Sequence, residues 1–289
     1  MTMAAHGFKR IVLRLQPRVP DRTARLAVEL AELLDLDLLG LFLDDTSLRD
    51  LASLPFAREL RTLGGGWQPL DIERLSRELD TAARSAERLF AEMAQRIPAR
   101  CRFEVVRGSP RTAIEATSRV GDIVVILEPG SPSERFTDQF SWLSDAAFRS
   151  AAAVLLVPPR IARTIGPIVA VATAPDDPCI DTALVIAAAA KEELVVIEAH
   201  ADAGPGAPLP AMATERGVRV RRVSLGPAGA ANTTLLAGAL ERVPVRLIVL
   251  TQGAFDRAVA TAIASAQQVP VLVLEPRPPD AASERAASL

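Results

Sequence analysis

The stretch from Leu127 to Trp142, LEPGSPSERFTDQFSW, places a glycine and several hydroxyl side chains between an aliphatic run and a helical pattern. In a loop between a buried strand and a helix, backbone N–H groups and the helix N-terminus can bind a phosphate. The residues that could line such a site are Gly130, Ser131, Ser133, Ser141 and Ser144. The alternative is an ordinary polar connection that binds nothing.

Other polar side chains follow neighbouring predicted strands. Arg14 and Gln16 lie at the end of the first strand, and Arg107 and Arg111 follow the third. Carboxyl ends of parallel strands meet at one edge of a sheet, where ligands bind in this kind of architecture. A cluster of arginines there could bind an anion. The alternative is a solvated surface, since nearly all positive charge in this chain is arginine.

The remaining reactive side chains form no catalytic or metal-binding pattern. The sequence has two cysteines, Cys101 and Cys179, one in each half. Two such distant cysteines form neither a disulfide scaffold nor a zinc-binding pattern. Two aspartates precede Cys179 and oppose the thiolate, so we expect a passive thiol. The two histidines, His6 and His200, have no nucleophile motif nearby. We therefore expect no enzyme activity and no metal.

The composition is that of a globular protein, with 49% hydrophobic and 24% charged residues over 289 positions. A net charge of −2 and the absence of a basic stripe argue against nucleic-acid binding. The longest uncharged runs contain breakers or amides, which argues against membrane spans. The N-terminus has no signal-peptide core, so we expect a cytoplasmic location.

The first half of the chain alternates strand and helix patterns, as the positions of apolar residues and breakers show. Strands are predicted at Phe8–Leu15, Leu38–Leu43, Phe103–Val106, Asp122–Leu127 and Val154–Val157. Helices are predicted from Asp21, from Asp71 to Pro98, at Thr112–Ser118 and at Asp138–Ser150.

The second half repeats this order. Strands are predicted at Ile168–Ala172, Leu194–Ala199, Val218–Val223, Leu247–Thr251 and Val271–Leu274, and helices at Pro178–Ala190, Ala231–Leu240 and Asp256–Gln267. A Gly/Pro-rich loop from Asp202 to Pro210 replaces the long second helix, and the residues after Pro276 are predicted to be disordered.

Alternating strands and helices predict a parallel sheet that is covered by helices on both faces. We therefore predict a tandem α/β protein with one domain at 1–159, a shorter one at 160–276 and a tail at 277–289.

The first domain carries an apolar insert at residues 46–70. Leu48, Leu51 and Leu54 share a helical face, and Phe56 follows. A flexible glycine run then ends in Trp67. Such an insert could dock a protein partner or act as a lid over a pocket. The alternative is that it packs on its own chain.

The stretch Val105–Ile126, VVRGSPRTAIEATSRVGDIVVI, resembles the universal stress protein family. A strand, a Gly-x-Pro turn at Gly108 to Pro110, a short helix with Ile114, and Asp122 entering an apolar strand all fit that family. The last strand of each half also fits its Pro-Val-Leu-Val ending. The resemblance implies two flavodoxin-like, doubly wound, Rossmann-like domains of the adenine nucleotide alpha hydrolase type.

Nucleotide-binding members of that family have an Asp after the first strand and a loop of the form Gly-x2-Gly-x9-Gly-[Ser/Thr]. In this sequence neither first strand is followed directly by a carboxylate. Glu128, Ser131 and Ser141 fall at the three glycine positions, with Gly130 one position off, and Trp142 follows them. In the second half the loop is too short. We therefore predict a degenerate nucleotide site.

The resemblance favours a stress-response regulatory module that acts through protein–protein contacts, either as a homo-oligomer such as a dimer or with another protein. No bound cofactor is expected. The alternative is a sensor that binds ATP, AMP or another anion in the first domain only. A phosphohydrolase is a weaker third reading, because a base, a nucleophile and a metal site are missing.

Overall fold

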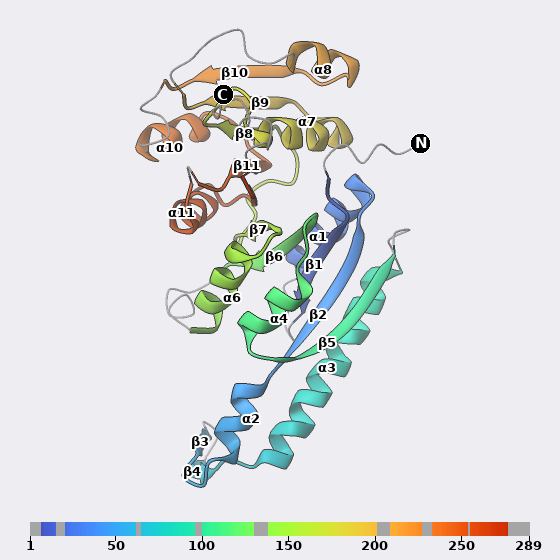
Figure 1. Cartoon of the computed structure of the whole chain (residues 1–289), viewed down its shortest axis with the longest axis vertical. Coiled ribbons are helices and arrows are strands. Elements are labelled where there is room, and N and C mark those ends of the chain that lie inside the picture. Colours follow the sequence, from blue (N-terminus) through green and yellow to red (C-terminus); the bar gives the residue numbers. More distant parts are fainter. Residues whose placement is uncertain are drawn as a thin grey trace, which may run out of the picture.

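The computed structural model describes residues 7–15, 21–61, 65–95, 100–129, 138–200, 209–226, 233–253 and 255–276. These residues form one ten-stranded sheet with helices on both faces, and a separate two-stranded hairpin (Figure 1). In these ranges no helix has both the length and the apolar character that a membrane span needs.

The first half supplies the elements up to β7. They are β1 (Arg10–Leu15), α1 (Asp21–Leu34), β2 (Asp37–Asp45), α2 (Thr46–Ser53), β3 (Arg58–Arg61), β4 (Gly65–Pro69), α3 (Ile72–Ala94), β5 (Cys101–Gly108), α4 (Pro110–Thr117), β6 (Asp122–Leu127), α6 (Asp138–Arg149) and β7 (Ala153–Val157).

The second half supplies the rest. They are β8 (Ile168–Ala172), α7 (Pro178–Ala190), β9 (Leu194–Glu198), α8 (Leu209–Glu215), β10 (Val220–Ser224), α10 (Thr233–Glu241), β11 (Leu247–Thr251), α11 (Arg257–Gln267) and β12 (Val271–Leu274). Every predicted strand of the large sheet is present, with ends that differ by at most two residues.

The strand order is β10-β9-β8-β11-β12-β7-β6-β1-β2-β5. Within each half the order is third, second, first, fourth, fifth, and all pairs are parallel. The two halves join where β7 pairs with β12 in the antiparallel direction, with Leu155 opposite Leu272. This repeated doubly wound order confirms the predicted fold class.

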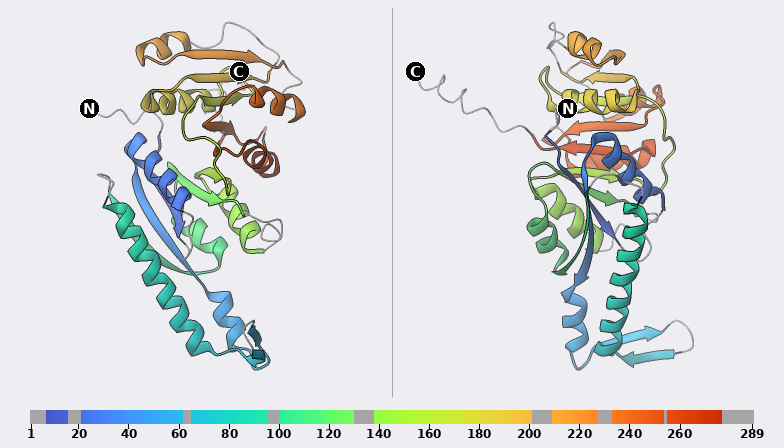
Figure 2. Two further views of the ribbon diagram at one scale, coloured as in Figure 1. Left: turned by 180° about the vertical axis from the view of Figure 1, so that it is seen from behind. Right: turned by 90° about the vertical axis from the view of Figure 1, so that its right-hand side faces the viewer.

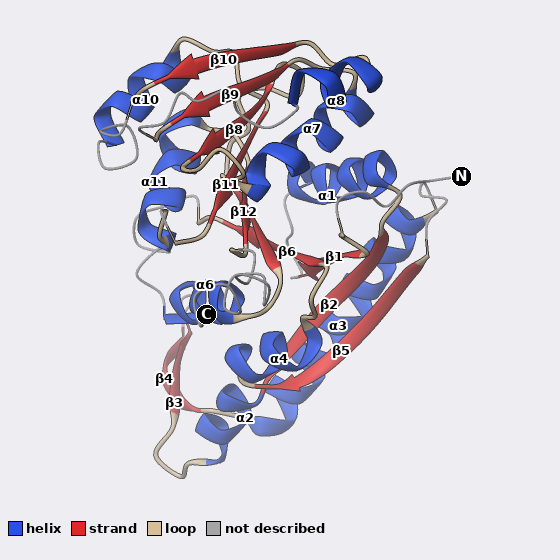
Figure 3. Ribbon diagram, turned by 45° about the horizontal axis from the view of Figure 1, so that its top comes forward, coloured by secondary structure: helices blue, strands red, loops and turns tan. Residues whose placement is uncertain are grey.

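Helices lie on both faces of the sheet, as Figures 2 and 3 show. Each face carries a hydrophobic core, and each core extends through both halves. Helices α1, α3, α7 and α8 cover one face, and α4, α6, α10 and α11 cover the other. The strands are buried on both sides, which is why they read as continuous apolar runs in the sequence.

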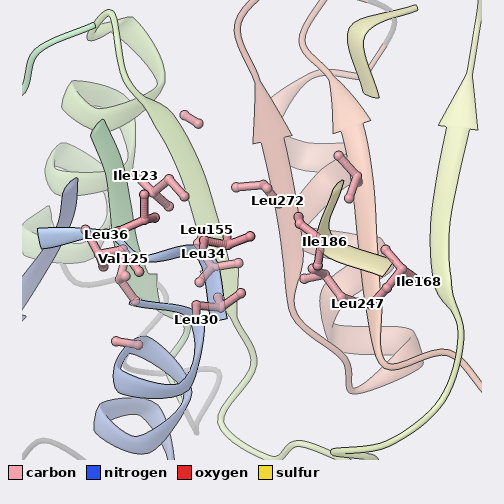
Figure 4. Packing of buried hydrophobic residues seen from close by; sticks show 14 of the residues in the cluster. Leu30, Leu34, Leu36, Ile123, Val125, Leu155, Ile168, Ile186, Leu247 and Leu272 are labelled. Carbon is pink, nitrogen blue, oxygen red and sulfur yellow. The ribbon is translucent and has the colours of Figure 1, made fainter. Parts of the chain in front are cut away.

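The joint between the halves is part of this core rather than a linker. Figure 4 shows Leu155 of β7 beside Leu272 of β12, with Leu30 and Leu34 of α1 on the same side of the sheet. Polar contacts also cross the joint: Arg246 pairs with Glu29 at 2.6 Å, Arg257 pairs with Asp145 at 3.4 Å, and the Gln252 amide donates to the Phe148 carbonyl at 3.1 Å.

Helix α3 begins as predicted at Asp71, whose carboxylate accepts hydrogen bonds from the backbone N–H groups of Glu73 and Arg74. The buried side of α3 contains Ala86 and Phe90. Phe90 lies so close to Gly40 of β2 that a Cβ at Gly40 would come within 2.5 Å of its ring. A glycine at this position therefore sets the distance between α3 and the sheet.

The predicted insert projects from one end of the molecule, as Figures 1 and 2 show. We call residues 46–72 the arm. Its helix, α2, is where the leucine spacing predicts it. The hairpin β3–β4 was not predicted: Gly65 and Gly66, expected in a flexible link, belong to strand β4, and Leu60 lies opposite Trp67. An ion pair between Glu59 and Arg74 ties the hairpin to α3.

Two predictions concern the second half and the tail. Most of the predicted Gly/Pro-rich loop, Asp202–Pro210, lies outside the described residues. The prediction is wrong for its last two residues, Leu209 and Pro210, because they begin the short helix α8. The predicted disordered tail at 277–289 also lies outside the described residues.

Candidate functional site

In each half, the first and fourth strands are neighbours, and the chain leaves them in opposite directions along the sheet. This is the switch point at which doubly wound folds bind ligands. The strand ends that form it are Leu15 of β1 and Leu127 of β6 in the first half, and Ala172 of β8 and Thr251 of β11 in the second.

In the second half a buried carboxylate of the protein itself occupies this position. Asp177, the N-cap of α7, accepts hydrogen bonds from the Thr251 hydroxyl at 2.5 Å and from the Cys179 backbone N–H at 3.1 Å. Its other oxygen accepts from the backbone N–H and the hydroxyl of Thr173, at 3.0 and 3.1 Å. Asp177 and Thr251 are buried. A phosphate there would be repelled by the negative charge of Asp177, whose two oxygens already accept hydrogen bonds from the protein.

Sequence reasoning missed this role. Nucleotide-binding members of the family carry a carboxylate directly after the first strand, but here Thr173 and Ala174 follow β8. Asp177 comes five residues after the strand and returns to it through the turn before α7. The Asp-Pro pair that opens α7 was the available signal, because it marks an N-cap whose side chain faces the strand ends.

Cys179 is fully buried, and its thiol lies 3.4 Å from the carbonyl oxygen of Val171. Burial raises the pKa of the Cys179 thiol well above its ordinary value, and the charge of Asp177 raises it further. The predicted passive role fits a neutral, buried thiol.

In the first half, Glu128 takes the first glycine position of the family's loop, directly after β6. Its side chain is almost fully buried. One carboxylate oxygen accepts a hydrogen bond from the Ser265 hydroxyl of α11 at 2.6 Å, and the Glu128 backbone N–H donates to the Val157 carbonyl at 2.8 Å. Glu128, at a position where the family binds phosphate, thus forms a hydrogen bond to the second half instead.

The other predicted site residues are only partly described. Gln16, Gly130, Ser131 and Ser133 lie outside the described residues. Ser141 and Ser144 belong to α6. Ser144 is buried, and its hydroxyl donates to the Phe140 carbonyl at 2.8 Å, one turn earlier in the same helix. This hydroxyl therefore serves the helix rather than a ligand.

The arginines of the predicted cluster, Arg14, Arg107 and Arg111, each lie near a carboxylate of the protein itself. Asp44, at the end of β2, pairs with Arg49 of α2 at 2.9 Å and with Arg107 of β5 at 3.2 Å. Burial lowers the pKa of the Arg14 guanidinium to about 10, and the charge of Asp45 opposes that shift. Two arginines of the predicted cluster thus lie next to buried aspartates.

These ion pairs also hold the arm. Besides its ion pair with Asp44, Arg49 donates a hydrogen bond to the Ser76 hydroxyl of α3 at 2.9 Å. The carboxyl edge of β2, α2 and α3 are therefore linked through one side chain. The first half uses this part of its strand edge to anchor the arm.

Apolar side chains of the arm are exposed to solvent. Phe56 is 76% exposed and Trp67 is 63% exposed, and Leu51, Leu54 and Ile72 are at least 40% exposed. The side chain of Leu48 lies outside the described residues. Within the described chain, no group of three or more His, Cys, Asp or Glu side chains could hold a metal ion.

No protein-family model and no curated protein sequence matches the chain. Solved structures match nearly all of it. A universal stress protein from Archaeoglobus fulgidus DSM 4304 superposes with a TM-score of 0.61 at 14% identity, over 94% of this chain and 98% of that one.

Two Pseudomonas aeruginosa structures give similar results. A putative universal stress protein from strain UCBPP-PA14 has a TM-score of 0.55 at 19% identity, over 99% of this chain and 100% of that one. A functionally unknown protein from strain PAO1 has a TM-score of 0.53 at 18% identity, over 94% of each chain. The chain therefore has the universal stress protein fold over nearly its full length, as the resemblance of its motifs predicts.

Proposed function

We propose that the protein is a regulatory binding module of the universal stress protein type, which acts through protein–protein contacts and does not bind ATP. The observation that carries this proposal is the arm. Five apolar side chains of one projecting segment, among them Phe56 and Trp67, are at least 40% exposed. Aromatic side chains grouped in this way are typical of protein interaction sites.

The hairpin geometry supports an outward-facing contact surface. Glu59 lies opposite Gln68, and the next residue, Leu60, lies opposite Trp67. Because neighbouring residues of a strand point to opposite sides, Glu59 and Trp67 lie on opposite faces of the hairpin. Glu59 pairs with Arg74 of α3, so its face looks toward the protein body. The Trp67 face therefore looks away from α3.

The two switch points support the absence of ATP binding. Asp177 occupies the one in the second half, and Glu128 contributes a buried carboxylate to the one in the first half. Both groups oppose a polyphosphate through charge. The antiparallel edge at β7 and β12 is also used within the chain, so a homo-oligomer would form through another surface, such as the arm.

The test replaces the two aromatic side chains together, as Phe56→Ser with Trp67→Ser. The matched control replaces Val120 and Ile165 by Ser, because these residues are 78% and 75% exposed but lie outside the arm. Self-association is measured by sedimentation over a concentration series, and partner binding by capture from the native cell extract. We expect the arm variant alone to lose the complex. Equal behaviour of the two variants would refute the proposal.

A second candidate is a sensor of ATP, AMP or another anion in the first half. It is favoured by one difference between the halves: ten residues separate β6 from α6 in the first half, whereas five separate β11 from α11 in the second. Thermal unfolding with ATP, ADP, AMP and cyclic dinucleotides separates the candidates. Ligand at 100 times its Kd would stabilise the protein by about 2.7 kcal/mol. We expect no stabilisation by any of these nucleotides.

A further inference from the structure

A hollow of about 310 Å³ lies between α4 and α6, on the face of the sheet opposite α3. Its lining consists of Ser109, Arg111, Trp142, Asp145, Ala146 and Arg149. The described residues of this lining belong to α6, to α4 and to its N-cap Ser109, and none of them belongs to strands β1 or β6. The hollow is also independent of the arm and of the function proposed above.

Side chains on one side of α6 line this hollow. Trp142, Ala146 and Arg149 are spaced by four and three residues and share a helical face. Trp142 and Arg149 are therefore about 10 Å apart along the helix. Between them Ala146 is buried and small, which leaves room above it. The Trp142 indole is 49% exposed, so a flat ring could lie against it.

The charge of Arg149 is available to a ligand. Asp145 lies one turn before Arg149, a spacing that favours an ion pair within the helix. The structure instead pairs Asp145 with Arg257 of α11, at 3.4 Å across the joint. In the described part of the chain, Arg149 forms no ion pair and no hydrogen bond.

A second cation lies at the α4 side of the hollow. Arg111 pairs with Glu115 at 2.9 Å, but both side chains are largely exposed. Exposed pairs of this kind contribute little, so Arg111 can turn to an anion at small cost. The hollow therefore combines an open aromatic surface with two guanidinium groups. Among its described lining residues the one carboxylate, that of Asp145, is paired with Arg257.

A second hollow of about 300 Å³ adjoins the first and shares Asp145 and Arg149 with it. It is lined further by Phe148, Gln252, Gly253, Asp256 and Arg257. A ligand at Arg149 would therefore contact α6 of the first half beside the start of α11 in the second half.

We propose that the α4–α6 hollow binds a planar aromatic anion that carries its carboxylate or phosphate group directly on the ring, unlike a nucleotide, in which a sugar separates the two. The ring lies against Trp142, and the anionic group lies on Arg149 and Arg111. Indole faces bind flat rings, and guanidinium groups bind both kinds of anion in a bidentate manner. A neutral aromatic molecule would leave the guanidinium groups unused, and a small inorganic anion would leave the indole unused.

The two tryptophans make the test direct, because the full-length protein gives only two indole N–H signals in a 1H–15N spectrum. The Trp67→Phe variant assigns them. The probes are 1-naphthoate, phenyl phosphate, inorganic phosphate and the uncharged 1-naphthylmethanol, and calorimetry gives each Kd. We expect at least one aromatic anion to shift the Trp142 signal and leave the Trp67 signal in place.

Inorganic phosphate and the uncharged alcohol should bind about tenfold more weakly, because each loses one of the two interactions. Arg149→Gln and Trp142→Ala should weaken the aromatic anion by a similar factor. The matched control is Arg84→Gln, which changes an exposed arginine of α3 on the opposite face. Circular dichroism checks that each variant is folded.

The proposal is overturned if neither aromatic anion shifts the Trp142 signal at millimolar concentration. It is also overturned if the uncharged alcohol binds as tightly as the anions, or if Arg149→Gln binds them like Arg84→Gln. None of these results depends on whether the arm binds a protein, so the two proposals fail separately.

Discussion

The two halves of the chain bring the same strands together at their switch points and place different side chains there. In the second half, Asp177 binds Thr173, Thr251 and the start of its own helix α7. In the first half, Glu128 binds Ser265 of α11, which belongs to the other half. The buried carboxylate of Asp177 therefore makes contacts within its own half, whereas that of Glu128 connects the two halves.

This difference shows two ways in which a ligand-binding edge can be converted to structure. A buried carboxylate is stable only when its oxygens accept enough hydrogen bonds. Asp177 receives them locally, from residues within its own half. Glu128 accepts a hydrogen bond from Ser265 in the other half, so this bond depends on how the two halves are placed. The first half also uses the end of β2 to hold the arm, through Asp44 and Arg49.

Replacing Asp177 should produce the largest effect on stability. Asp177→Ala removes the acceptor of several buried donors at once, and unsatisfied buried donors cost about 1–3 kcal/mol each where they cannot reach water. We expect the free energy of unfolding to fall by about 3 kcal/mol, measured by urea denaturation. The substitution should not create ATP binding, because the loop after β11 stays short.

The matched control for this variant is Asp176→Ala. Asp176 is the preceding residue and is exposed, so its loss should change stability by less than about 0.5 kcal/mol. Equal stability of the two variants would mean that the Asp177 network does not stabilise the second half.

The thiol beside Asp177 gives a pH-dependent difference between the halves. The pKa of Cys179 is raised in the folded protein, first by burial and then by Asp177. The folded state therefore keeps this proton at a pH where the unfolded chain loses it. The resulting stability is complete below the unfolded pKa, about 8.5, and is lost as the pH rises toward the folded pKa.

Above pH 8.5 this group alone should lower the free energy of unfolding by about 1.4 kcal/mol per pH unit. Urea denaturation between pH 7.5 and 10 measures the slope. Cys179→Ala should show a shallower slope than the wild type. Cys101→Ala is the control: Cys101 is only partly buried, and its pKa is raised less, so removing it should change the slope less. A Cys179→Ala slope equal to that of the wild type would contradict the assignment.

Local patterns were sufficient to predict the elements of the large sheet. Strand β6 is found at Asp122–Leu127 and helix α7 at Pro178–Ala190, both as predicted. Buried parallel strands read as apolar runs, and caps mark helix ends, so neighbouring residues contain the signal. The hairpin β3–β4 was missed because its sequences, RELR and GGWQP, have neither alternation nor β-branched residues.

Contacts between distant residues could not be predicted from such patterns. The sequence predicts that Glu128 is unsuited to phosphate, but it does not predict its partner Ser265, which lies 137 residues away. The antiparallel pairing of β7 with β12 also joins distant parts of the sequence. It could not be predicted, because both strands are apolar on both faces and either edge would fit a neighbour. Periodicity identifies a buried face, and tertiary packing alone determines what it contacts.

The smallest effect is expected for the contact between Glu128 and Ser265, and it is the one that tests the connecting role of the first half. Ser265→Ala removes one hydrogen bond to a carboxylate, and Glu128→Ala removes the acceptor. A double-mutant cycle should give a coupling of about 1 kcal/mol in urea denaturation. The control cycle pairs Ser265→Ala with Asp177→Ala and should be additive, because Ser265 bonds to Glu128 whereas Asp177 bonds to Thr173, Cys179 and Thr251. If Glu128 and Ser265 are also additive, the carboxylate does not connect the halves, and the two switch points differ only in their residues.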